Sequence, residues 1–171
     1  MAGTKFSGFT AGATTGNTKI VGYDSTGSTN NQYSLTEVTD GLKQHGGLIE
    51  SFIIASSDET TDLTTGDGKA TFQFPYDFTL LAGIEGIRAS VNTAPVGSTI
   101  TIDIEQGGST ILTTLLTIDA SEKTSYTAAA PVVISDTTLT KNTEIKINID
   151  QVGSGTAGKG LKVMFIGYKT P

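Results

Sequence analysis

The chain has 171 residues, a mass of 17.7 kDa and a formal net charge of −6, which fits one domain or one domain with an arm. It has no Cys, which excludes disulfides, thiolate metal sites and a cysteine nucleophile, and its single His excludes a His-cluster metal site. The acidic balance argues against nucleic-acid binding through phosphates, and no apolar run reaches the length of a membrane span.

Charged residues make up 16% of the chain, against roughly 25% in an average soluble protein. Glycine and β-branched residues are abundant instead, and β-branched side chains favour pleated sheets over helices. A surface so poor in charge is either covered by Thr and Ser or partly hidden by other chains. Composition leaves these two alternatives open.

The first 34 residues differ from the remainder of the chain. Residues 12–17 and 24–31 are small and polar, which is typical of loops and linkers, and residues 19–23 between them predict one short strand. This segment has too few apolar residues for a core of its own. A disordered tail is one interpretation of this composition; we predict instead an N-terminal attachment arm over residues 1–47 that a neighbouring subunit holds in place.

One short helix is predicted near the end of this arm. Ser34 and Glu37 have capping-box spacing, an apolar stripe follows, and Gly46 and Gly47 end it. The stripe consists of Leu35, Val38 and Leu42. His45 falls in the last turn, where we interpret it as a surface residue.

Short strands separated by turns are predicted over residues 48–171. Residues 49–55 are apolar enough for a buried strand, and Gly107-Gly108 predicts a hairpin. Apolar residues alternate with polar ones in several further segments, namely 70–74, 87–91, 100–105 and 145–150. In residues 161–166, Leu161, Val163 and Phe165 alternate with Lys162, Met164 and Ile166, and residues 78–80, 111–118 and 132–134 complete the predicted strands.

This spacing, without helical crossovers, predicts an all-β fold. We expect an antiparallel, jelly-roll-like β-sandwich over residues 48–171, preceded by the extended arm and the short helix. A parallel sheet would need longer apolar runs and crossover helices.

Three segments contain residues that could take part in binding or catalysis. The acidic loop 58–68 offers oxygen ligands for Ca²⁺ but lacks EF-hand spacing, and whether it binds a cation stays open. Asp103 and Glu105 share one strand face and are expected to be solvated rather than to form a glycosidase pair. Residues 153–160 lack the context and spacing of a phosphate loop, so we predict a hairpin loop. No catalytic residue, cofactor or metal site is predicted.

Much of the chain from about residue 51 to 169 resembles a β-sandwich domain in virion structural proteins of tailed bacteriophages. The residues that carry the resemblance are 74–80, 87–98, 101–105, 118–125, 147–154 and 160–168. Residues 20–23 and 33–37 resemble short attachment arms of other phage structural proteins, and residues 82–85 look like an insertion relative to the family pattern.

The resemblance implies a virion component at the capsid surface. We expect a non-enzymatic decoration (cement) protein that binds the major capsid protein or neighbouring virion proteins and stabilises the shell. The alternative is a head- or tail-fibre or adaptor protein whose sandwich binds a host surface glycan, and head, neck and tail locations stay open. No nucleic-acid or membrane partner is expected.

Apolar residues on both faces of some strands predict contact between subunits, since a sandwich strand needs only one apolar face. The resemblance implies a homotrimer, since virion proteins of this kind often lie about three-fold axes of a shell, and we expect Ile111, Leu115, Met164 and Ile166 at the subunit interface. Coverage of the second apolar face by the arm is the alternative. Ile20, Val21 and Tyr23 are the expected anchoring residues of the arm.

Overall fold

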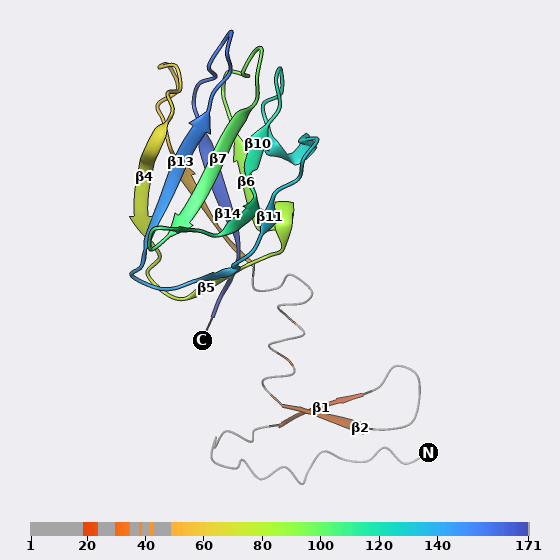
Figure 1. Cartoon of the computed structure of the whole chain (residues 1–171). Helices are drawn as coiled ribbons and strands as arrows, with labels where there is room; N and C mark the ends of the chain where they lie inside the picture. The colour runs from red at the N-terminus through yellow and green to blue at the C-terminus, as the bar shows by residue number, and fades with distance from the viewer. Residues whose placement is uncertain (1–18, 24–29, 35–37, 39–41, 43–48, 171) are drawn as a thin grey trace. The chain divides into compact units, whose positions relative to one another are not determined.

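The computed structural model describes residues 19–23, 30–34, 38, 42 and 49–170 (Figure 1). The chain divides into two compact units, Met1–Gly47 and Leu48–Pro171.

The N-terminal unit contains one antiparallel pair of strands, β1 (Lys19–Tyr23) and β2 (Asn30–Ser34), with Lys19 opposite Ser34 and Tyr23 opposite Asn30. β1 was predicted, whereas the loop composition of residues 30 and 31 hid β2. Backbone hydrogen bonds to β1 hold β2 in an extended conformation, although its side chains are polar. Val38 and Leu42 have helical backbone geometry, and the other helical positions of the predicted helix and His45 lie outside the described residues.

The second unit is an antiparallel β-sandwich of jelly-roll topology, as the sequence predicts. In one sheet, called here the β14 sheet, the first strand of the unit pairs with the last; in the other, the β13 sheet, the second strand pairs with the penultimate one. The β14 sheet has the order β12 (Thr138–Leu139), β5 (Phe78–Leu80), β14 (Lys162–Lys169) and β3 (Glu50–Ala55), and β6 (Ile87–Ser90) also pairs with β14.

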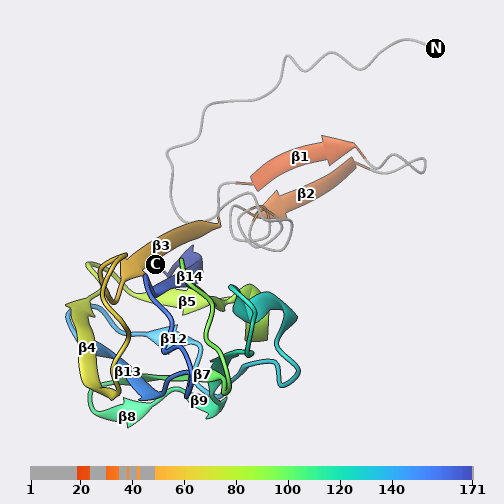
Figure 2. The same ribbon diagram turned by 90° about the horizontal axis from the view of Figure 1, so that it is seen from above.

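The β13 sheet has the order β10 (Leu116–Ile118), β7 (Ile100–Gln106), β13 (Glu144–Gln151) and β4 (Gly66–Gln73), and β8 (Ser109–Thr110) pairs with β7. A further pair joins β9 (Leu112–Thr114) to β11 (Val133–Ile134), and two single-turn 3₁₀ helices, η1 (Gly83–Glu85) and η2 (Ser125–Thr127), lie in the connections. Figure 2 shows β3, β14 and β5 in one layer and β4, β13 and β7 in the other.

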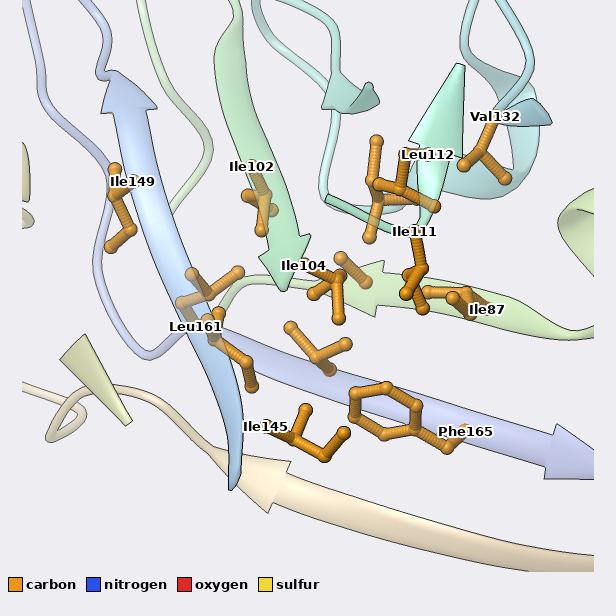
Figure 3. Packing of buried hydrophobic residues seen from close by; sticks show 14 of the residues in the cluster. Ile87, Ile102, Ile104, Ile111, Leu112, Val132, Ile145, Ile149, Leu161 and Phe165 are labelled. Carbon is orange, nitrogen blue, oxygen red and sulfur yellow. The ribbon is translucent and has the colours of Figure 1, made fainter. Parts of the chain in front are cut away.

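The core lies between the two sheets and follows from the alternation in the sequence. Every second residue of β7 and β13 points inward and is buried, and the same holds for Val163 and Phe165 of β14. Figure 3 shows the isoleucines of β7 and β13 facing Phe165. An aromatic cluster closes one side of the core and consists of Phe52, Phe72, Phe74, Phe78 and Phe165, with Phe74 and Phe78 stacked at 5.2 Å between ring centroids.

Two sequence predictions need correction. β3 was predicted to be buried, but it is an edge strand, and Ile53 within it is 60% exposed. Residues 153–160 were predicted as a hairpin loop, but they carry the chain from β13 in one sheet to β14 in the other. Both errors have the same cause: a local sequence pattern does not determine which strands pair with one another.

Candidate interaction surfaces

The two ends of the sandwich differ in how they are built. At one end, Glu50, the first residue of β3, lies opposite Gly167, close to the last residues of β14. The chain therefore enters the sandwich at the end where it also leaves it. At the other end, called here the loop end, residues 56–65, 91–99 and 152–161 connect the strands (Figure 1).

Backbone hydrogen bonds hold the loop end together. The amide of Val96 donates to the carbonyl of Thr156 at 2.9 Å, and the amide of Leu63 donates to that of Gly158 at 2.9 Å. Gly153 is required here, because a Cβ on it would lie 1.9 Å from the Thr156 carbonyl oxygen. The glycines of this segment therefore serve close packing of loops, and no helix follows them to complete a phosphate site.

Three of the four carboxylates of the acidic loop 58–68 bind partners within the protein. Asp58 Oδ1 accepts the amides of Thr60 and Thr61, both at 2.7 Å, and these bonds hold the pKa of Asp58 far below its usual range. Glu59 pairs with Lys162, and Asp62 pairs with Lys159 at 3.4 Å. Within the part of the chain that the structure describes, no group of three or more His, Cys, Asp or Glu could hold a metal ion.

The outer face of the β13 sheet is polar and acidic. Asp103 and Glu105 lie on it, half-buried, as their alternation with the core isoleucines predicts. Asp103 Oδ1 accepts the Ile104 amide at 2.8 Å and the Thr110 hydroxyl. Asp150 is exposed, and partial desolvation in the folded protein raises its pKa. The nearby charge of Asp103, followed by those of Asp67 and Glu105, raises this pKa further.

The outer face of the β14 sheet is more apolar. Met164 lies opposite Ile53 on one side and opposite Arg88 on the other, so the three residues form a row across β3, β14 and β6. Arg88 pairs with Glu85, and its guanidinium carbon lies 5.0 Å from the ring centroid of Tyr126, whose side chain is itself exposed. This surface was missed because Ile53 was expected inside; its position on an edge strand is what exposes it.

The four residues predicted for the subunit interface do not share one surface. Met164 and Ile166 are half-buried and alternate with inward-pointing Val163 and Phe165, which places them on the outer face of the β14 sheet. Ile111 is 2% exposed and belongs to the core, and half-buried Leu115 packs against that core. A continuous strand would have placed Ile111 and Leu115 on the face opposite Leu112 and Leu116. The strand is instead interrupted at residue 111 and again at residue 115, and both side chains pack inward.

The predicted anchoring residues Ile20, Val21 and Tyr23 all lie in β1, the first strand of the N-terminal hairpin. The charge of the chain is divided unequally between the two units. Residues 1–47 carry three Lys and three acidic residues, whereas residues 48–171 carry eight Lys or Arg and fourteen Asp or Glu. The net charge of −6 therefore lies entirely in the sandwich unit.

No known protein family, curated protein or solved structure matches this chain at a significant level. Among the residues described, no helix is both long and apolar enough to cross a membrane.

Proposed function

We propose that this protein is a non-enzymatic virion structural protein of a tailed phage, most simply a capsid decoration protein that binds the outer shell and stabilises it. The supporting observation is the division into a compact jelly roll and a separate N-terminal unit that contains one hairpin. In this proposal, the arm that contains Ile20, Val21 and Tyr23 contacts the major capsid protein or its neighbours.

In this proposal the two ends of the sandwich have different roles, one for attachment and one facing outward. The arm joins at the end where β3 begins, and the hydrogen-bonded loop end lies at the opposite end of the strands. A tether at the first end leaves the loop end free to face outward. The net charge of residues 1–47 is zero, so the acidic charge of the sandwich does not extend to the arm that contacts the shell in this proposal.

A second candidate is a fibre or adaptor protein that binds a surface glycan. Tyr126 favours it, since the residue is 60% exposed, and exposed aromatic rings stack on sugars. Arg88 lies over that ring and holds it in place.

Copy number separates the two functions. Quantitative densitometry of purified virions, referenced to the major capsid protein, should find the protein in hundreds of copies per particle. Tens of copies or fewer would contradict a decoration role and favour the fibre role. Absence of the protein from purified particles would exclude both.

A further inference from the structure

The first strand of the sandwich, β3, lies beside β14 (Figure 2), and no other strand in the described part of the chain pairs with it. The side of β3 away from β14 is called here its open side. The amide of Ser56 donates to the carbonyl of Leu161 at 2.8 Å. In an antiparallel ladder the residues that bond a given neighbour alternate, so Phe52 and Ile54 bond β14. The backbone N–H and C=O groups of Ser51, Ile53 and Ala55 therefore point away from β14, toward the open side.

The far side of β14 agrees with this assignment. The amide of Ile166 donates to Gly86, and its carbonyl accepts the amide of Leu81, so Ile166 bonds the strands on the side away from β3. Its neighbour in the chain, Phe165, must then direct its backbone groups toward Phe52 of β3.

The side chains of β3 are also incompletely covered. Ile53 is 60% exposed on the outer face. Phe52 and Ile54 point inward and pack against the core, yet both remain half-buried because nothing described lies beyond the strand. One additional strand at this edge would cover all three side chains and satisfy the free backbone groups.

The devices that usually protect an edge strand are missing from β3. It has no Lys, no Pro and no shift in its register with β14, and its one charged residue, Glu50, bonds the hydroxyl of Tyr76. The other edges are protected: β10 and β12 have three and two residues, and β4 carries Asp67 and Lys69 and meets β13 at a register shift.

We propose that β3 binds β3 of a second copy in an antiparallel, two-fold pairing centred on Ile53. Facing residues of an antiparallel pair point to the same side of the sheet, so this register joins the two inner faces and the two outer faces. It sets Phe52 opposite Ile54 of the second copy, a favourable aromatic and β-branched pair, and sets Ser51 opposite Ala55.

Charge supports a second copy as the partner. The two Glu50 carboxylates lie at opposite ends of the new ladder, six residues or about 20 Å apart, which exceeds the screening length at physiological salt. Glu50 is the only charged residue of β3, so no like charges meet within the pairing. The two sandwich units, each with a charge of −6, still repel one another at longer range, so added salt should strengthen the association.

Light scattering coupled to size exclusion tests this inference on the full-length protein, independently of the proposed function. We expect twice the chain mass of 17.7 kDa across a micromolar dilution series, and one chain mass for Ile53→Lys with an unchanged circular dichroism spectrum. Val133→Lys is the matched control, because Val133 is also an exposed strand residue, and it should remain dimeric. A monomeric wild type, a mass three times that of the chain, or a dimeric Ile53→Lys would overturn the pairing.

Cysteine substitution tests the register, since the chain has no Cys of its own. A short bis-maleimide should cross-link Ile53→Cys efficiently, because residue 53 faces itself across the two-fold axis. Ser51→Cys should stay largely uncross-linked, because the two residues 51 lie about 14 Å apart along the strands. Equal cross-linking of both variants, or of neither, would contradict the proposed register.

Discussion

The backbone amide of Gly68 donates a 2.7 Å hydrogen bond to Oδ1 of Asn148, a side chain that is 3% exposed. The contact lies where β4 and β13 shift register, between Ile147 and Ile149. A register shift leaves an amide without its ladder partner, and the Asn148 side chain supplies a replacement.

Asn148→Ala should therefore lower the free energy of unfolding by about 1–3 kcal/mol, because it leaves the Gly68 amide without its acceptor. Chemical denaturation monitored by circular dichroism would measure the loss. Gln73→Ala, on an exposed position of the same strand β4, should change stability by no more than about 0.5 kcal/mol. Equal losses in the two variants would show that the hydrogen bond contributes nothing.

The turn between β7 and β8 depends on backbone geometry rather than on packing. Gly107 and Gly108 have φ of 58° and 84°, the signs of a type I′ hairpin turn, and a Cβ on Gly108 would meet no atom within 4 Å. Gly108→Ala should still cost about 1–2 kcal/mol, because an L side chain is strained at this φ.

Gly107→Asn is the control for the turn, since Asn tolerates the left-handed region, and it should cost less than about 0.5 kcal/mol. Both free energies are measurable by urea denaturation. Losses of the same size in Gly107→Asn and Gly108→Ala would contradict a role for φ.

The sequence predicted most of the jelly roll because burial alternates along its central strands. β7, β13 and β14 each have a sheet neighbour on both sides and the core on one face, so an inward apolar residue recurs at every second position, and in β7 and β13 it alternates with polar residues. β2 and β12 were missed because they are polar or very short, and their existence depends on a distant partner strand.

The surfaces were less predictable than the core. The run Phe52-Ile53-Ile54 is compatible with a buried central strand and with an edge strand. The order of the strands in the sheet, which the sequence does not give, is what exposes Ile53. Ile111 and Leu115 show the converse, because a continuous strand would place both on the face opposite Leu112 and Leu116. The strand is interrupted at these two residues, and both pack on the core.

Stability should fall with rising pH through the titration of Asp150. Partial desolvation and the neighbouring carboxylates raise the pKa of Asp150 in the folded protein, so the folded state binds a proton more tightly than the unfolded state. The cost of ionising this group is absent below the ordinary aspartate pKa of about 3.9, grows as pH rises, and is complete above the folded pKa.

Asp150→Asn should accordingly raise the melting temperature at neutral pH, and the gain should shrink in acid and in high salt. Asp62→Asn changes the net charge equally but removes a partner of Lys159, so it should give no gain. Thermal melts of both variants across pH would measure this difference. A gain for Asp150→Asn that persists below the ordinary aspartate pKa would contradict the linkage.

Removal of the arm should separate folding from attachment. All members of the hydrophobic core described here, from Phe52 to Phe165, lie in the sandwich unit, so deletion of residues 1–45 removes no side chain from it. We expect the truncated protein to keep the melting temperature of the full chain, because core burial dominates stability. It should fail to cosediment with shells that lack the protein, because in the proposed function the arm provides the contact.

A full-length Ile20→Asp, Val21→Asp variant, altered only in β1, should keep the fold and lose attachment in the same way. Binding of the truncated protein as tight as that of the full chain would show that the sandwich, rather than the arm, contacts the shell.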